Sequence, residues 1–183
     1  MPKRALDITQ LARLVNHGPT VIVSCAHEDR DNLITLAWCM PVSICPPMIG
    51  VAIAPARFSH DIIRQSGEFA VNIPSAELLG AVWRCGTVSG RDEDKFAGSG
   101  LTRFDASVIG APLVEECFAH IECTVESAPV AGDHTVFMGR AVAAMVEESA
   151  FDGRLSLDGA YRTLHHLGGS AFLTSAGERV TAA

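Results

Sequence analysis

The segment with the clearest chemical potential reads GDHTVFMG and covers Gly132–Gly139. A Gly-Asp pair favours a turn, and the alternating side chains after it are typical of a strand. The spacing therefore predicts that His134 lies at the mouth of a sheet rather than inside it. A histidine at such a place can donate a hydrogen bond to a bound molecule, or it can simply close the turn.

Motifs of several other reaction classes are missing from the sequence. No G-x-G-x-x-G follows a predicted strand, because Gly98 and Gly100 lead into Leu-Thr-Arg, and no Walker loop occurs. Neither a serine nor a cysteine hydrolase is indicated, since no nucleophile elbow is present. His165 and His166 are adjacent and are expected to point apart, and the other histidines have no metal-ligand spacing. We expect no metal site and no separate dinucleotide-binding domain.

Length and charge limit the class of protein. The chain has 183 residues, of which 48% are apolar, and a formal net charge of −7. A chain of this length can form a core without disulfides or metal, so we expect one domain over residues 1–183. The negative charge disfavours nucleic acids and anionic membranes as partners, because both require a positive field. A few local arginines and lysines could still bind one phosphate.

The sequence also indicates a cellular compartment. The longest apolar run, residues 42–56, contains three prolines and is too short to span a bilayer, and no signal-peptide core is present. We therefore expect a soluble, cytoplasmic protein. Cys117 and Cys123 would lie roughly 20 Å apart along one predicted strand, beyond disulfide reach. No C-x-x-C pair occurs, so the six cysteines are expected to be reduced.

The apolar pattern predicts mostly strands. Strands are expected at residues 20–26, 33–38, 48–54, 69–73, 117–126 and 136–146, and short helices at 8–15, 59–66 and 76–83. Residues 29–32 are predicted to form a polar turn, and about the last ten residues a loose tail. The helices are too few for a βαβ repeat, so the pattern favours an all-β fold with minor helices, arranged as an antiparallel barrel.

Six strings in order resemble the flavin reductase-like family, and within it the flavoredoxin branch. They are NLITLAW (32–38), VSICPPMIGVAI (42–53), GEFAVNIP (67–74), SGRDEDKF (89–96), APLVEEC (111–117) and GDHTVFMG (132–139). One string alone could arise by chance, whereas their order is specific. The resemblance covers residues 20–146 and implies a Greek-key split β-barrel that binds FMN, with FAD also possible. It further implies a homodimer with the flavin near the subunit interface.

The resemblance implies a phosphate site in two short polar segments. The FMN phosphate is a dianion that requires several N–H or O–H donors and one or two cations. A helix start after an arginine is also a favourable seat for an anion. The candidate ligands are Arg57, Ser59, Ser89, Arg91 and Lys95. Residues 91–95 could instead be a solvated helix start.

The resemblance places further residues around the flavin ring, which requires an apolar slot with donors at one edge. Asn32 and Thr35 are the candidate donors, and Trp38 is a candidate wall. Phe58 stands where the family usually has Tyr or Trp, and Phe172 is expected to cover the ring. Asn32 could instead be a turn residue, and Trp38 and Phe172 could be core residues.

The implied activity is NAD(P)H-dependent reduction of flavin, with electrons or reduced flavin passed to a monooxygenase or a redox protein. Hydride transfer from nicotinamide to flavin is direct, so His134 would orient a ligand rather than move a proton. It could contact the flavin, the nicotinamide or the phosphate. The alternatives are a flavoredoxin-type electron carrier with tightly held FMN, and a flavin- or haem-binding module without turnover. Cys45 departs from the family pattern and could line the site or be an inert buried thiol.

Overall fold

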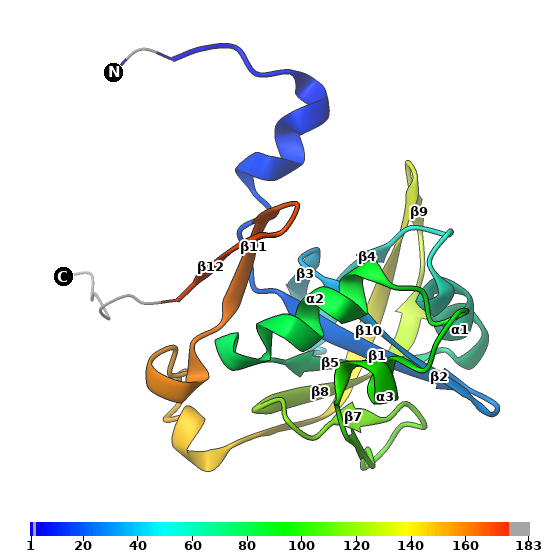
Figure 1. Cartoon of the computed structure of the whole chain (residues 1–183). Helices are drawn as coiled ribbons and strands as arrows, with labels where there is room; N and C mark the ends of the chain where they lie inside the picture. Colours follow the sequence, from blue (N-terminus) through cyan, green and yellow to red (C-terminus); the bar gives the residue numbers. More distant parts are fainter. Residues whose placement is uncertain (2, 176–183) are drawn as a thin grey trace.

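An eight-stranded antiparallel sheet is the main element of the computed structural model, which describes Met1 and residues 3–175 (Figure 1). The strand order is β2-β1-β5-β8-β10-β4-β3, with β9 paired to β10. The strands of this sheet are β1 (Val21–His27), β2 (Arg30–Leu36), β3 (Cys39–Ser43), β4 (Met48–Ile53), β5 (Glu68–Ile73), β8 (Ala119–Ser127), β9 (Val130–Ala131) and β10 (His134–Val146). Two separate hairpins pair β6 (Arg103–Phe104) with β7 (Leu113–Val114), and β11 (Leu164–Gly168) with β12 (Ala171–Thr174).

The two edges of the sheet are joined by a very short link. β2 and β3 are the first and last strands of the order, yet only Ala37 and Trp38 separate them in the chain. The Ala52 N–H of β4 also donates to the Trp38 carbonyl at 3.1 Å. Because two residues span so short a distance, the sheet must curl until its edges meet at this link. The predicted all-β split barrel with minor helices is confirmed.

Strand β1 is buried on both faces because its alternating side chains enter two different cores. Val21, Val23 and Cys25 enter the core inside the barrel, together with residues such as Phe69. Ile22 points the other way, into a second core. That core is covered by α2 (Leu79–Thr87) and α3 (Lys95–Ser99). The helices therefore pack on the outer face of the strands that start the barrel.

Close packing inside the barrel requires a glycine in β10. A Cβ atom on Gly139 would lie 2.6 Å from the Phe69 ring and 2.8 Å from the Cys123 Cβ. The pairing of β10 with β8 shifts register between Met138 and Gly139, so the strand bends at this position. Helix α1 (Phe58–Ser66) adds Ile62 and Ile63 to the same core and ends at Gly67, whose φ of 71° is left-handed.

Three predicted boundaries are wrong. The turn predicted at 29–32 is only Glu28 and Asp29, so Asn32 lies inside β2, opposite Cys25. The strand predicted from residue 117 begins at Ala119, because the Phe118 N–H bonds to the end of β5. The helix predicted at 76–83 is a 3-10 turn, η2 (Ala76–Leu78), followed by α2, which continues to Thr87.

The two ends of the chain also differ from expectation. The predicted N-terminal helix is a 3-10 helix, η1 (Ile8–Leu14), which stands away from the barrel and has no buried residue (Figure 1). The predicted C-terminal tail is preceded by the β11–β12 hairpin, and residues 176–183 lie outside the described part of the chain. None of the described helices is long and apolar enough to cross a bilayer.

All six cysteines are free thiols, and Cys25, Cys85, Cys117 and Cys123 are buried. Burial raises the pKa of Cys25 to about 12. Cys45 is exposed rather than buried. Four of the thiols therefore behave as small apolar core residues.

A buried carboxylate on β8 anchors the loop at residues 105–111 to the sheet. Glu122 on β8 is only 2% exposed, and its oxygens accept from the Ser107 N–H and hydroxyl at 2.8 and 2.7 Å. The backbone N–H groups of Val108 and Ile109 donate to the other oxygen at 2.7 and 3.2 Å. Burial alone would raise the pKa of Glu122, but these four bonds hold it below its ordinary value of 4.5. The polar face of β8 is therefore covered by this loop rather than by water.

We expect Glu122→Gln to destabilise the fold by about 2–3 kcal/mol at neutral pH, because an amide turns donors toward buried N–H groups. Since the folded state lowers the pKa, the advantage of the carboxylate is complete above pH 4.5 and is lost as the pH falls through the folded-state pKa. Thermal unfolding between pH 7 and 3 should show the two proteins converging on the acid side. Glu77→Gln, on exposed η2, is the control; equal stability of Glu122→Gln and wild type at pH 7 would contradict this role.

Candidate functional site

Three adjoining cavities form one continuous cleft where the barrel is split. Their volumes are about 520, 310 and 160 Å³, and they are called here the central, aromatic and anion chambers. Gly86 of α2 lines all three. Thr35 and His166 line the central and aromatic chambers, while Ile34 and Arg57 line the central and anion chambers. A single elongated ligand could therefore extend through more than one chamber.

The anion chamber combines two cations with no acid. Its lining includes Arg57, Phe58, Ser89 and Lys95, and none of the described residues that line it is acidic. Neither cation has a salt bridge within the described part of the chain. Burial, with Arg57 close by, lowers the pKa of Lys95. A bound anion would offset the repulsion between these two positive charges.

Lys95 is held in place by the chain itself. It is 6% exposed, and its Nζ donates to the carbonyls of Leu33 and Cys85, both at 2.7 Å. An ammonium group has three N–H donors, so one remains for a ligand. Because Cys85 belongs to the part of α2 beyond its predicted end, the extra turn of this helix is what fixes the lysine.

Asn32 leaves a buried polar atom without a partner. Its Nδ2 donates to the Ser59 hydroxyl at 2.8 Å, whereas its Oδ1 has no partner among the described residues. A Cβ on Gly90 would lie 2.0 Å from this Oδ1, so only glycine fits there. Such an orphaned acceptor is costly unless a ligand donates to it. A ligand hydroxyl in the anion chamber would satisfy it.

The central chamber is lined by an aromatic pair at its mouth. The rings of Trp38 and His134 lie 4.7 Å apart at 40°. His134 is the first residue of β10, and its Nδ1 lies 2.7 Å from the Asp133 carboxylate, whose pKa it lowers. The Trp38 indole donates to the Asn16 side chain at 2.8 Å. Trp38 is 44% exposed, so it forms a chamber wall and not a core residue.

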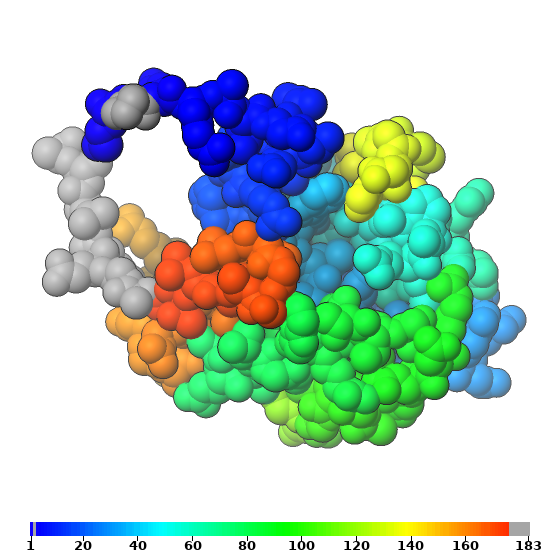
Figure 2. Space-filling model, turned by 45° about the horizontal axis from the view of Figure 1, so that its top comes forward, coloured from blue at the N-terminus to red at the C-terminus, as the bar shows by residue number. Residues whose placement is uncertain are grey.

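The aromatic chamber lies under the C-terminal hairpin. Phe172 contacts Trp83 of α2 edge-on at 6.3 Å and His166 at 5.0 Å, centroid to centroid. The Thr35 hydroxyl donates to the Val82 carbonyl at 2.6 Å and ties β2 to α2. Figure 2 shows the orange-red hairpin beside the blue N-terminal segment, with the green segment that contains α2 next to it. These segments form the rim of the cleft.

The cleft brings together most of the predicted site residues. Those that line it are Asn32, Thr35, Trp38, Arg57, Phe58, Ser89, Lys95, His134 and Phe172. Ser59 does not line it, but supports Asn32 from behind. Arg91 does not line the cleft but lies next to the anion chamber: its guanidinium donates to Asp61 at 2.7 Å and to the carbonyl of Ala56, a lining residue, at 3.1 Å.

Two residues of the rim are not predicted by the sequence. Asn16 and His166 meet across 150 positions, with Asn16 Nδ2 3.2 Å from His166 Nδ1. No local pattern marks either residue, because their proximity depends on how the C-terminal hairpin folds back. His166 and His165 do point apart: His165 faces the His17 carbonyl at 2.8 Å. No group of three potential metal ligands occurs among the described residues.

Comparison with known proteins identifies the family. The family model described as flavin reductase like domain matches residues 12–165. The chain belongs to the flavin reductase-like family. Within this family it is 38% identical over 183 residues to the uncharacterized protein YddH of Escherichia coli K12, covering 97% of this chain and 96% of YddH. It is also 36% identical over 99 residues to HsaB of Rhodococcus jostii, described as the reductase subunit of a flavin-dependent monooxygenase, covering 54% of this chain and 48% of HsaB.

Two solved structures of similar fold bear on the cofactor. An FMN-binding protein from Thermus thermophilus superimposes with a TM-score of 0.88 at 27% identity, covering 100% of this chain and 99% of that one. The flavoredoxin of Desulfovibrio vulgaris gives a TM-score of 0.82 at 27% identity, covering 100% and 95%. The predicted resemblance to the flavin reductase-like family is confirmed.

The residues present fit FMN. The phosphate requires cations and donors, which the anion chamber supplies, and the ribityl hydroxyls could donate to the orphaned Asn32 Oδ1. The ring requires a flat slot with an apolar wall, and the central chamber is lined by residues of β2 and β4 and by Trp38.

We expect Lys95→Met to weaken FMN binding about 10- to 150-fold, or roughly 1.5–3 kcal/mol, because the phosphate loses a charged donor. Titration followed by flavin fluorescence measures the dissociation constant. Arg140→Met is the matched control and should change it little, since Arg140 is paired with Glu126 and lines none of the three chambers. Unchanged FMN binding by a folded Lys95→Met would remove this lysine from the site.

Proposed function

We propose that this protein uses NADH or NADPH to reduce FMN and passes electrons or reduced flavin to an acceptor. The observation that carries the proposal is the arrangement of the cleft: a cationic, acid-free anion chamber shares Ile34, Arg57 and Gly86 with a central chamber lined by β2, β4, Trp38 and His134. This order of environments suits a phosphate at one end of a ligand and a planar redox ring at the other. FAD carries an additional adenosine monophosphate. It would suit the same cleft only if that part extended into solvent.

Bound FMN would supply a ring that accepts hydride directly from nicotinamide. Lys95, Arg57 and Ser89 would hold its phosphate, while Asn32, supported by Ser59, would hold the ribityl chain. Thr35 and Trp38 would line the ring. Phe172 would cover the far side of the cleft.

His134 would orient the nicotinamide. With its Nδ1–H donating to Asp133, the neutral ring leaves Nε2 as an acceptor, which suits the amide N–H of the nicotinamide carboxamide. Asp133 fixes this tautomer and the ring plane, and Trp38 packs against the ring from the side. His134 therefore acts by position and does not need to exchange a proton.

Anaerobic mixing of the protein and FMN with NADH, and separately with NADPH, tests the activity: flavin absorbance should bleach within seconds with one or both. His134→Ala should slow this reduction about ten- to a hundredfold, because the nicotinamide is misplaced, and leave the FMN dissociation constant unchanged. Equal loss of binding and reduction would make His134 a flavin-binding or structural residue. A wild-type protein that binds FMN but is reduced by neither nucleotide would contradict the reductase and favour the second candidate.

That second candidate is an electron carrier that retains its FMN and is reduced by another protein. Its support is the similarity to a flavoredoxin, together with the buried, uncompensated Lys95, which favours tight retention of a phosphate. For the reductase, the similarity to HsaB supports a monooxygenase component as the acceptor.

We also propose that the protein is a homodimer. The apolar side chains of η1 are largely exposed: Ile8 by 76%, Leu11 by 51% and Leu14 by 65%. Ile44, beyond β3, is 96% exposed. A monomer rarely leaves so much apolar surface in water, and a second copy could cover it next to the cleft.

Sedimentation equilibrium at micromolar concentration should give twice the chain mass. Ile8→Gln/Leu11→Gln should shift the protein toward monomer, because it places amides in the proposed interface. The control Val108→Gln replaces an exposed valine of the loop at residues 105–111 and should stay dimeric. A wild-type protein that sediments as a monomer would refute the dimer.

A further inference from the structure

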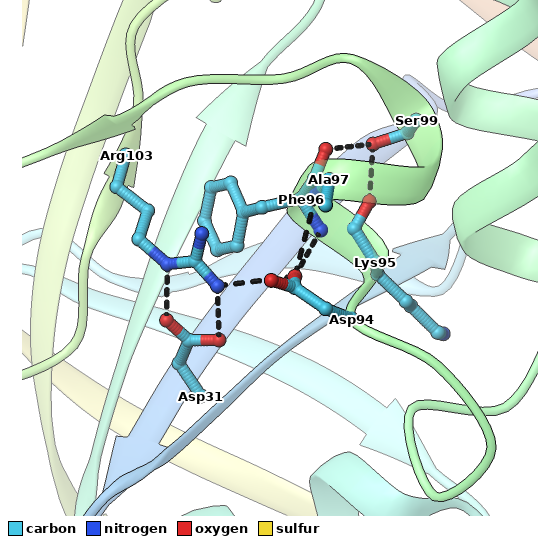
Figure 3. A network of polar contacts seen from close by, with 7 residues as sticks. All are labelled: Asp31, Asp94, Lys95, Phe96, Ala97, Ser99 and Arg103. Atoms are coloured by element: carbon cyan, nitrogen blue, oxygen red, sulfur yellow. Dashed lines mark hydrogen bonds and ion pairs between the residues drawn. The ribbon is translucent and has the colours of Figure 1, made fainter.

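An arginine outside the cleft connects the two segments that supply the anion chamber. Arg103 of β6 donates to both carboxylate oxygens of Asp31, at 2.6 and 3.1 Å, and to Asp94 at 3.0 Å (Figure 3). Its guanidinium also lies 4.3 Å from the centre of the Phe96 ring. Arg103 itself lines neither the anion chamber nor the central chamber.

Each carboxylate is the immediate neighbour of a residue of the anion chamber. Asp31 precedes Asn32 on β2, and Asp94 precedes Lys95 at the start of α3. Consecutive Cα atoms are about 3.8 Å apart, so moving either aspartate moves the chamber residue beside it. The guanidinium of Arg103 therefore sets the distance between Asp31 of β2 and Asp94 at the start of α3.

Asp94 also determines where α3 begins. Its carboxylate caps the helix by accepting from the N–H groups of Phe96 at 2.9 Å and Ala97 at 3.3 Å. Burial opposes the charge on Asp94, but the Ala97 N–H and Arg103 hold its pKa below the ordinary value. In Figure 3 the Lys95 side chain extends from this capped turn, away from the network. The cap and Arg103 thus fix the backbone from which the Lys95 side chain extends. The carbonyls of Leu33 and Cys85 fix its Nζ atom.

The positive charge of Arg103 also changes the electrostatics beside the anion chamber. Without it, two carboxylates would stand uncompensated next to a chamber that must attract a dianion, and they would also repel each other. The network is partly exposed, with 44% of the Arg103 side chain accessible, so its effect on global stability is small. The network should instead affect the geometry and charge of the anion chamber next to it.

We propose that Arg103 is a positioning residue for the phosphate of the flavin: it holds Asn32 and Lys95 in register and offsets one of the two negative charges that the aspartates place beside the anion chamber. This role rests on the proposed binding of FMN in the cleft. It predicts an effect that depends on the phosphate, because riboflavin has the same ring and ribityl chain but no phosphate.

The test compares dissociation constants for FMN and riboflavin. For Arg103→Gln, the constant for FMN should rise about fivefold, the equivalent of one surface ion-pair interaction, while that for riboflavin should rise by a clearly smaller factor, because only the Asn32 contact with the ribityl chain is affected. Arg103→Lys keeps the charge but loses the two-pronged contact, so it should recover part of the preference for FMN. Arg140→Gln removes an exposed arginine that pairs with Glu126 elsewhere on the sheet, and should match wild type.

A loss of affinity by the same factor for both flavins, or no loss for either, would overturn the role of Arg103, because the effect would then be general or absent. If Arg103→Gln fails to fold, the dissociation constants of Arg103→Lys for FMN and riboflavin are compared with those of the wild type instead. Equal binding of FMN and riboflavin by the wild type is a different result: it would refute the phosphate assignment itself, and the role of Arg103 with it.

Discussion

The two residues between β2 and β3 constrain the whole molecule. Because Ala37 and Trp38 connect opposite edges of the sheet, the sheet has to curl into a barrel, and the edges have to meet at this link. The cleft opens there, since residues 34–38 of β2 and the link, together with residues 52–54 at the end of β4, line the central chamber. Trp38 belongs to the link and also forms a wall of the central chamber. The same constraint that closes the fold therefore creates its binding site.

Charge distribution completes the site within an acidic protein. A net charge of −7 would repel a phosphate, but four acidic side chains near the anion chamber are paired with arginines: Asp31 and Asp94 with Arg103, Glu93 with Arg84 and Asp61 with Arg91. Lys95 and Arg57 are left unpaired among the described residues. The positive field at the cleft thus comes from the local pairing of acids, and not from an excess of basic residues.

The sequence predicts the barrel and most of the site, and the exceptions share a physical cause. Lys95, Asn32 and His134 are identified by local strings that resemble a family, and each lines the cleft. Arg91 is part of such a string too, but its guanidinium pairs with Asp61, 30 positions away, and it lies beside the chamber without lining it. Asn16 and His166 join the rim across 150 positions through the C-terminal hairpin, which no local pattern marks. Contacts distant in sequence, rather than the strand pattern, decide which candidates reach the cleft.

The central claim is that the split of the barrel holds FMN with its phosphate in the anion chamber and its ring beside Trp38 and His134. The most direct measurement is a crystal structure of the protein grown with FMN. The account predicts electron density for the phosphate between Arg57 and Lys95, a ribityl hydroxyl donating to Asn32, and the ring against β2 in the central chamber. Flavin bound elsewhere, or bound in the cleft with its phosphate away from Lys95, would contradict the account.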